Sequence, residues 1–240
     1  MGKNHLLNLN APKSWKFNRK ETKFVARPIP GPHSMDKSLT LTFILRELLK
    51  QAKTTKEIKM ILTNGEVLVD KKKRTEVKYP VGLMDVLEIP KLEEHYRMIL
   101  KTDGTLTLIS IDNKEADIKL LKVINKTIVK KGKFQITFHD GRNILLDKSE
   151  CKIGDSALFN IKDNKISKWI PLTKESLVYL SAGGHVGSLG KIVDILKTRD
   201  LQKPKVIVEI NGKNYITLMS YSFVVGKDKP EISLGEKKWA

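Results

Sequence analysis

The sequence predicts a mainly β protein with one small α/β module, two small β-barrels and an extended basic N-terminal arm. Three observations support this fold class. Hairpin turn signals recur after residue 93, helical periodicity is confined to residues 39–63, and residues 1–38 contain four prolines without apolar periodicity. Regular hairpins with little helix between them favour antiparallel barrels over a parallel α/β sheet.

The charge balance is the strongest global property of the chain. Its 240 residues include 45 Lys and Arg against 27 Asp and Glu, a net charge of +18. A protein this basic repels itself unless it meets an anion, and nucleic acid is the commonest large anion. A surface that is basic only for solubility is the weaker alternative.

Several classes of protein are not expected. The chain has no apolar run long enough to span a membrane and no apolar segment typical of a signal peptide at its start. Cys151 is the only cysteine, so neither an intrachain disulfide nor a cysteine-based zinc site is possible. We therefore expect a cytoplasmic protein with no membrane partner.

Residues 1–38 form the predicted basic arm. Three aromatic residues, Trp15, Phe17 and Phe24, lie among its positive charges. Rings that stack on bases and cations that contact phosphates would suit RNA, and the alternative is that the rings fix the arm to the protein's own domains. The basic residues of the arm are Lys3, Lys13, Lys16, Arg19, Lys20, Lys23, Arg27 and Lys37.

Two helices are predicted after the arm. An apolar stripe over residues 39–52 indicates the first, and Thr54 with Glu57 forms a capping box for the second, which ends at Asn64-Gly65. The strand "EVLVD" and the run "KKKR" follow, and we expect this run to converge with the helices' basic faces rather than form a merely solvated loop. The basic residues concerned are Arg46, Lys50, Lys53, Lys56, Lys59, Lys71, Lys72, Lys73 and Arg74.

The second half of the chain is predicted to form β-hairpins. Alternating strands at 105–108, 134–138 and 206–210 accompany the turn signals, and the half divides near Pro171. The turn signals are Asp103-Gly104, Lys131-Gly132, Asp140-Gly141, Asp163-Asn164 and Asn211-Gly212.

The stretch "SAGGHVGSLGKIVDI" at 181–195 holds four glycines. Its spacing matches neither a phosphate-binding loop nor a dinucleotide fingerprint, and a strand follows it rather than a helix whose N-terminus would bind phosphate. It is better explained as a β turn whose glycines allow positive φ and close backbone approach.

Catalytic patterns are absent from the sequence. No histidine lies in a metal-binding motif, and His139 beside Asp140 is better explained by a hairpin turn than by an acid–base pair. We expect no enzyme activity, no cofactor, no metal and no small-molecule substrate.

Two segments resemble known RNA-binding modules. Residues 54–89 resemble the S-four-type RNA-binding fold, although Asp70 and Lys71 stand where that fold usually has Asn-Gly, and Met84 where many members have glycine. "GGHVGSLGKIVDI" resembles a KOW motif of SH3-like barrels, which implies that His185 and Lys191 face the partner.

The order of the motifs resembles one family along essentially the whole chain. "HLLNLNAPKSWKF", "RPIPGPHS", the S-four-like unit, "HDGRN", the KOW-like stretch and "FVVGKDKPEISL" follow one another as in the archaeal/eukaryotic e-type small-subunit ribosomal protein four family. This family places two basic residues shortly after His5, where Leu7 and Asn8 stand here. The resemblance implies a structural ribosomal protein that binds small-subunit ribosomal RNA beside neighbouring ribosomal proteins.

Two other functions use the same modules. An RNA-modifying enzyme such as a pseudouridine synthase needs a catalytic aspartate in a motif like G-R-L-D, whereas "GRNI" stands at 141–144. A transcription elongation factor would use the KOW barrel but would not explain the S-four-like unit or the arm.

We therefore expect four parts: a basic arm over 1–38, an S-four-like domain over 39–92, a central SH3-like barrel over 93–173 and a KOW barrel over 174–240. The predicted RNA contacts are the basic residues of the arm except Lys37, those of the two helices and the lysine run, together with Trp15, His139, Arg142, His185 and Lys191.

Overall fold

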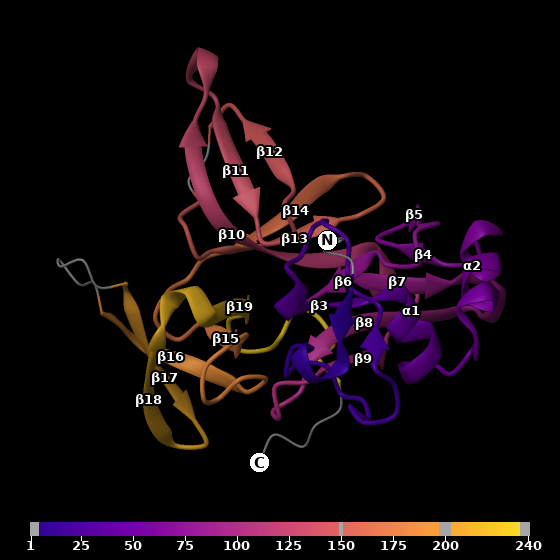
Figure 1. The fold of residues 1–240 in the computed structure, drawn as a ribbon. Helices are drawn as coiled ribbons and strands as arrows, with labels where there is room; N and C mark the ends of the chain where they lie inside the picture. The colour runs from indigo at the N-terminus through magenta and orange to yellow at the C-terminus, as the bar shows by residue number, and fades with distance from the viewer. Residues whose placement is uncertain (1–4, 149–150, 197–202, 236–240) are drawn as a thin grey trace. The chain divides into compact units, whose positions relative to one another are not determined.

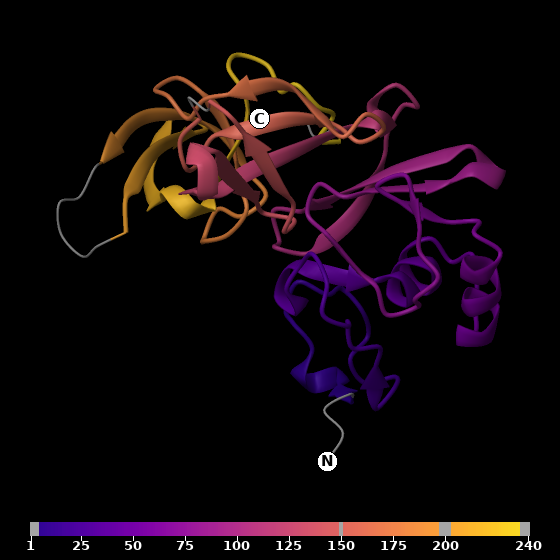
Figure 2. The same ribbon diagram turned by 90° about the horizontal axis from the view of Figure 1, so that it is seen from above.

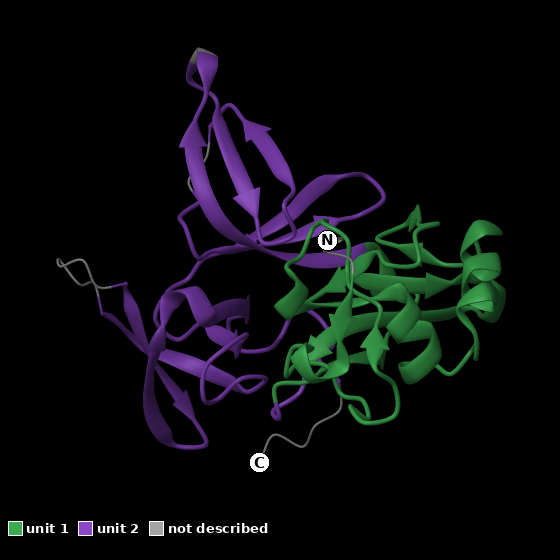
Figure 3. Cartoon of the chain, in the orientation of Figure 1, with its two compact units in different colours: residues 1–100, 104–117 green, residues 101–103, 118–240 purple. Residues whose placement is uncertain are grey.

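The structure is a computed structural model that describes residues 5–148, 151–196 and 203–235. The chain divides into two compact units (Figure 3). Unit 1 comprises Met1–Leu100 and Gly104–Asp117, and unit 2 comprises Lys101–Asp103 and Ile118–Ala240. The described residues are mostly β, with few helices and several small sheets, as the sequence predicts.

Unit 1 begins with the predicted arm, which is folded rather than extended. Strand β1 (Leu6–Leu7) pairs with β2 (Phe24–Val25), and β3 (Ser38–Thr40) pairs with β6 (Pro80–Gly82). Short 3₁₀ turns at Asn8–Asn10 and Met35–Lys37 connect these segments. Residues 5–38 therefore fold back on themselves, which differs from the predicted extended arm.

The first helix is shorter than the sequence predicts. Helix α1 (Leu41–Phe43) continues only as a π-helical turn, Ile44–Leu48, and Lys50 has a left-handed φ of 54°. The prediction over 39–52 is wrong at both ends, because Leu39 and Thr40 pair with β6 instead. The apolar stripe nevertheless faces the core, where Leu41, Ile44 and Leu45 are fully buried.

The second helix agrees with its prediction. Helix α2 (Thr55–Thr63) begins after Thr54, whose side chain accepts a hydrogen bond from Glu57 N while the Glu57 carboxylate accepts one from Thr54 N. Asn64 ends the helix, and Gly65 follows with a φ of 71°. The capping box and the glycine stop are confirmed.

The main sheet of unit 1 runs past the expected domain boundary at residue 93. Strand β7 pairs with β8, so β8 and β9, which were expected in the central barrel, extend the sheet of the S-four-like part. A tight connection makes this pairing local, since Glu93 adopts a left-handed φ of 55° directly before β8. The strands in sheet order are β5 (Lys72–Lys73), β4 (Leu68–Val69), β7 (Val86–Ile89), β8 (Glu94–Leu100) and β9 (Leu106–Ser110), with 3₁₀ turns at Pro90–Leu92 and Glu115–Asp117.

Unit 2 contains two five-stranded antiparallel sheets (Figures 1 and 2). In the first sheet, the long strand β10 pairs with β11 over one part of its length and with β13 over another. The pairing with β13 ends at Lys122, and a bulge between Val123 and Asn125 then interrupts the register with β11 and bends the strand. The strands in order are β12 (Asn143–Leu146), β11 (Phe134–Phe138), β10 (Ile118–Ile128), β13 (Ser156–Asn160) and β14 (Lys165–Ile170), with a 3₁₀ turn at Lys130–Gly132.

The second sheet of unit 2 contains the predicted strand "KIVDI". It lies within β16, which pairs with β15 on one side and β17 on the other. The strands in order are β18 (Lys213–Leu218), β17 (Lys205–Ile210), β16 (Leu189–Leu196), β15 (Leu177–Leu180) and β19 (Ser222–Gly226), with a 3₁₀ turn at Met219–Tyr221.

A buried lysine joins the two sheets of unit 2. Lys122 on β10 is only 7% exposed, and its ammonium donates to the backbone carbonyls of Ser220 at 2.7 Å and Ser222 at 2.6 Å, and to that of Met219 at 3.3 Å. Three carbonyl oxygens replace the water that the charged group loses on burial, so the lysine fixes the turn before β19 against β10.

All five predicted hairpin turns connect strands. Asp103-Gly104 joins β8 to β9, Lys131-Gly132 joins β10 to β11, Asp140-Gly141 joins β11 to β12, Asp163-Asn164 joins β13 to β14, and Asn211-Gly212 joins β17 to β18. Each pair supplies at least one residue of positive φ, namely Gly104, Gly132, Gly141, Asn164, Asn211 or Gly212. The turn predictions are confirmed because this conformation depends on local residue type.

Candidate nucleic-acid interface

Helix α2 presents a basic outer face. Ile58 and Leu62 are fully buried on its inner side, whereas Lys56 and Lys59 are exposed on the other. No ion pair joins either lysine to a carboxylate within the part of the chain that the structure describes. Their charges therefore remain available to an anionic partner.

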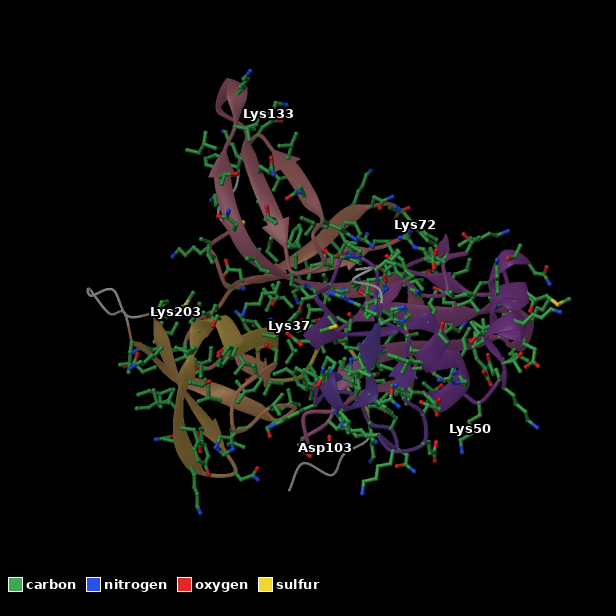
Figure 4. All side chains as sticks on the ribbon, in the orientation of Figure 1. Lys37, Lys50, Lys72, Asp103, Lys133 and Lys203 are labelled. Carbon is green, nitrogen blue, oxygen red and sulfur yellow. The ribbon has the colours of Figure 1, made fainter. Side chains whose placement is uncertain are left out.

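The hairpin of β4 and β5 adds two more exposed lysines beside the end of this helix. Asp70 and Lys71 make the turn with φ values of 50° and 61°, so they adopt the left-handed backbone without the Asn-Gly common in this fold. Lys72 and Lys73 follow on the exposed strand β5 (Figure 4). A Cβ at Gly65 would lie 3.0 Å from Lys73 Cδ, so the lysine run lies against the end of α2.

The other two residues of the lysine run, Lys71 and Arg74, are half-buried and contact other side chains of the protein. Lys71 Nζ lies 2.9 Å from a Glu88 carboxylate oxygen and 2.8 Å from one of Asp117. Burial lowers the pKa of Lys71, but the two carboxylates outweigh it and raise that pKa above its ordinary value. Arg74 packs its guanidinium 4.4 Å from the centre of the Tyr79 ring. Lys71 thus secures the hairpin through its two carboxylate partners, and its contact with RNA stays a prediction.

The three basic residues before α2 do not share a helical face. Arg46 lies in the π-helical turn and pairs its Nε with Glu47 at 2.8 Å, while Lys50 and Lys53 come after that turn has ended. The prediction of one common face is wrong, because the left-handed φ of Lys50 ends the helix there. Lys50 and Lys53 are both exposed close to the start of α2.

Trp15 is part of the core of unit 1. It is 2% exposed, its indole N–H donates to the carbonyl of Ser38 at 2.9 Å, and its ring centre lies 5.6 Å from that of Phe43. Phe17 packs edge-on against the same Phe43 ring at 5.6 Å. Trp15 is therefore not exposed for stacking on RNA, and the alternative, that the rings fix the arm to its own domain, holds for Trp15 and Phe17.

Arg19 also has an internal role. Its guanidinium donates to the backbone carbonyls of Asn8, Ala11 and Pro12 at 2.8–3.2 Å, which satisfies three acceptors at the start of the arm. Arg27 is half-buried, and Lys3 lies outside the described residues. The exposed cations of the arm are Lys13, Lys16, Lys20, Lys23 and Lys37.

The "HDGR" turn of unit 2 is built around a buried carboxylate. Asp140 lies 3.2 Å from Lys119 Nζ and 2.8 Å from Arg142 Nε, and it accepts the backbone N–H of Arg142 at 3.1 Å. Burial raises the pKa of Asp140, but the charge of Lys119 and the hydrogen bond from Arg142 N lower it below its ordinary value. His139 turns inward, where its Nδ1 accepts from Lys122 N at 3.2 Å and its ring packs edge-on against Phe223. His139 and Arg142 therefore stabilise this turn, and their contact with RNA stays a prediction.

Glycines of the glycine-rich loop pack closely against other segments of the same chain. Gly183 and Gly187 have φ values of 96° and 73°, and a Cβ at Gly187 would lie 2.4 Å from the carbonyl carbon and oxygen of Lys101. A Cβ at Gly190 would lie 2.5 Å from Val208 Cγ1. Positive φ and close backbone approach both occur as predicted, but at these three positions the neighbour is this chain.

The two candidate contacts in and after the loop are on the surface. Lys191 is exposed, 4.0 Å from the Asp228 carboxylate. His185 is exposed and its ring centre lies 3.9 Å from that of Tyr215 on β18. Tyr215 was not among the predicted contacts, although its place shortly after the Asn211-Gly212 turn is a signal in the sequence.

Alanine at Gly187 should destabilise the fold. The left-handed φ alone costs about 1 kcal/mol, and the clash with Lys101 adds to it. Thermal unfolding of Gly187→Ala measures the loss. Gly184→Ala is the matched control, since no atom lies within 4 Å of a Cβ there. Equal melting temperatures for the two variants would contradict the role assigned to Gly187.

The described residues contain no group of three His, Cys, Asp or Glu side chains arranged to hold a metal ion. In that same part of the chain, no helix is long and apolar enough to cross a membrane. What the surface does offer is exposed lysines on α2, β5 and the arm, and the tilted His185–Tyr215 ring pair. Lysines suit phosphate contacts, and exposed rings suit base contacts.

Comparison with known proteins gives a consistent result along the chain. Residues 1–36 match the RS4NT (NUC023) domain, and residues 92–166 match ribosomal family S4e. The small ribosomal subunit protein eS4 of Methanothermobacter thermautotrophicus is 41% identical over 231 residues, which cover 96% of this chain and 95% of that protein. The protein of the same name from Methanococcus maripaludis is 41% identical over 239 residues, covering 96% of this chain and 97% of its own.

A solved structure agrees with the sequence matches. The crystal structure of the 30S ribosomal protein S4e from Thermoplasma acidophilum superimposes with a TM-score of 0.71 at 34% identity. The superposition covers 83% of this chain and 100% of that one.

Proposed function

Since this chain belongs to the S4e family of ribosomal proteins and is a structural, non-enzymatic constituent of the small ribosomal subunit, we propose that it binds ribosomal RNA mainly through unit 1. The proposed contact surface, called here the α2–β5 surface, consists of Lys56, Lys59, Lys72 and Lys73. The exposed lysines of the arm extend the set of phosphate contacts on the same unit.

The observation that carries this proposal is the meeting of the lysine run with the end of α2. Lys73 lies against Gly65, so the lysine run meets the end of the helix that carries Lys56 and Lys59. None of these four lysines has a carboxylate partner in the described residues, whereas Lys71 beside them has two. A neutralised lysine contributes little to phosphate binding, and four free ones release counterions when they contact a phosphate backbone.

The rival functions do not fit the family. An RNA-modifying enzyme would use the same RNA-binding modules, but the chain matches ribosomal proteins over 96% of its length. The "GRNI" segment at 141–144 has no aspartate. The aspartate directly before it, Asp140, is buried in a turn, where it pairs with Lys119 and Arg142. A transcription elongation factor would leave the α2–β5 surface and the folded arm unexplained.

We further propose that each sheet of unit 2 is an SH3-like barrel, and that the glycine-rich loop is a KOW-type turn. The support is that both sheets have five antiparallel strands, and that bulges interrupt the register of each. The four-part division of the chain, with parts at 1–38, 39–92, 93–173 and 174–240, remains a proposal. The pairing of β8 with β7, and of β9 with β8, favours moving the second boundary to about residue 117.

Charge reversal on the α2–β5 surface tests the proposal. We expect Lys56→Glu with Lys59→Glu, and Lys72→Glu with Lys73→Glu, each to weaken binding to transcribed small-subunit rRNA by about tenfold. Each lost phosphate contact should also lower the slope of log K against log salt by about 0.7–0.9. Filter binding or fluorescence anisotropy at several salt concentrations measures both quantities.

The control must change the net charge equally without touching this surface. Lys165→Glu with Lys227→Glu does so, because both lysines are exposed and belong to unit 2, whereas the α2–β5 surface belongs to unit 1. Circular dichroism should be the same for all three proteins. Equal binding by the control and the surface variants would show that only net charge matters and would overturn the assignment of this surface.

A further inference from the structure

The loop of unit 2 that holds the glycines brings an exposed ring onto a supported one. The centres of the His185 and Tyr215 rings lie 3.9 Å apart with an angle of 43° between their planes. His185 is exposed and Tyr215 is half-buried, so the histidine is the outer ring of a tilted pair. Tyr215 contacts one side of the His185 ring, and the other side of the histidine is left toward solvent.

The residues around this stack leave room for a ligand. No heavy atom lies within 4 Å of the position a Cβ would take at Gly184, directly before His185. A Cβ at Gly183 would lie 3.5 Å from the Tyr221 ring and 3.9 Å from Thr217 Oγ1, so Gly183 has neighbours on β18 and the turn after it, whereas Gly184 faces open space. The chain thus has a bare backbone beside the exposed ring.

A positive charge lies on the same face of the strand. Side chains alternate along β18, so Lys213, Tyr215 and Thr217 project to one face and Ile216 to the other. Lys213 is exposed and follows the Asn211-Gly212 turn at the open end of this row. The row therefore offers a cation next to a ring stack, which is the combination that single-stranded nucleic acid requires.

We propose that His185, backed by Tyr215, is a stacking platform for one unpaired base of ribosomal RNA, and that Lys213 contacts a phosphate next to that base. This proposal rests on the proposed function, because it names how unit 2 contributes to RNA binding. The rings bind the base through its flat face, so the site accepts any base that is free of a helix.

The geometry favours a base over a phosphate at His185. A phosphate contact needs a cation or a set of backbone N–H groups, and it does not need a second ring behind the first. The tyrosine supports the histidine in one orientation and so reduces the entropy that binding costs. Gly184 keeps the approach free of side-chain atoms.

Two probes of equal charge separate stacking from charge attraction. We would measure binding of the full-length chain to an oligoadenylate of about twelve nucleotides and to a matched strand in which the bases are absent. The chain should bind the strand with bases about tenfold more tightly, and His185→Ala should remove this difference. The salt slope of His185→Ala should equal that of the unchanged chain, since no phosphate contact is lost.

Three further variants define the platform. His185→Phe should retain the preference for bases because it keeps a ring, and Tyr215→Leu should weaken it because the second layer is gone. Lys213→Ala should leave the preference intact and lower the salt slope by about 0.7–0.9. Ile216→Ala is the matched control, since Ile216 is 67% exposed on the opposite face of the same strand and should change neither quantity.

The outcomes distinguish this inference from the proposed function. No preference for bases in the unchanged chain, or a preference that survives His185→Ala, would overturn the platform. A lower melting temperature of His185→Ala with an unchanged preference for bases would show that the ring pair only stabilises the loop. If small-subunit rRNA itself fails to bind the chain, the proposed function fails, whereas normal rRNA binding without base preference removes only the platform.

Discussion

Replacing Trp15 with alanine is expected to lower the free energy of unfolding by about 3–5 kcal/mol. The ring is 2% exposed and packs against Phe43, so the substitution leaves a cavity where the arm joins the core of unit 1. It also leaves the carbonyl of Ser38 without the indole N–H that it accepts. Chemical denaturation of the full-length chain, followed by circular dichroism, measures the loss.

Two other substitutions in the arm control this result. Trp15→Phe keeps most of the packing and removes the indole hydrogen bond, so it should cost about 1 kcal/mol. Phe24→Ala removes a ring that is 48% exposed and should cost less than Trp15→Ala. Similar losses for Trp15→Ala and Phe24→Ala would show that the arm is not docked through Trp15.

Replacing Lys122 with methionine should cost about 3 kcal/mol of stability. Methionine fills a similar volume, but the carbonyls of Met219, Ser220 and Ser222 lose the donor that satisfies them. An unsatisfied buried acceptor costs more than a typical hydrogen bond gains, and three of them share this lysine. The measurement is the urea midpoint of the full-length chain.

Lys168→Met provides the comparison on the surface of the same unit. Lys168 pairs with Glu231 but is 57% exposed, so losing its charge should change stability by less than about 1 kcal/mol. A loss for Lys122→Met as small as that for Lys168→Met would mean that the three carbonyls find other donors and that Lys122 does not join the two sheets.

Because the arm is docked in the core of unit 1, deleting it would not test its RNA contacts alone. Deleting residues 1–25 would remove Trp15 from the core, so weakened incorporation of the deleted protein would reflect lost folding as well as lost RNA contacts. Charge reversal at exposed arm lysines such as Lys13 and Lys16 avoids this ambiguity, because those side chains lie outside the core.

The sequence by itself determined the features that depend on neighbours within a few residues. The capping box of Thr54 and Glu57 is such a feature, because a carboxylate three positions after the cap reaches the cap's backbone N–H. The Asn211-Gly212 turn is another, because asparagine and glycine adopt positive φ at small cost. The family, too, followed from the order of motifs along the chain, and the comparisons confirmed it.

Contacts between distant parts of the chain decided which of several similar residues are paired inside the protein and which are exposed. Lys71, Lys72 and Lys73 are adjacent, yet only Lys71 meets Glu88 and Asp117 and is neutralised. Local periodicity also could not show that Leu39 and Thr40 pair with β6 rather than start a helix, since the partner strand lies far along the chain.

The aromatic residues show most clearly that local sequence does not determine whether a side chain is buried. Trp15 and His185 were both predicted to contact RNA, but only the tertiary structure buries the first against Phe43 and places the second on Tyr215. A ring among lysines has the same local sequence whether it joins a core or faces solvent. The apolar surface and hydrogen-bond partners that decide between these fates come from residues distant in sequence, so only the folded chain brings them together.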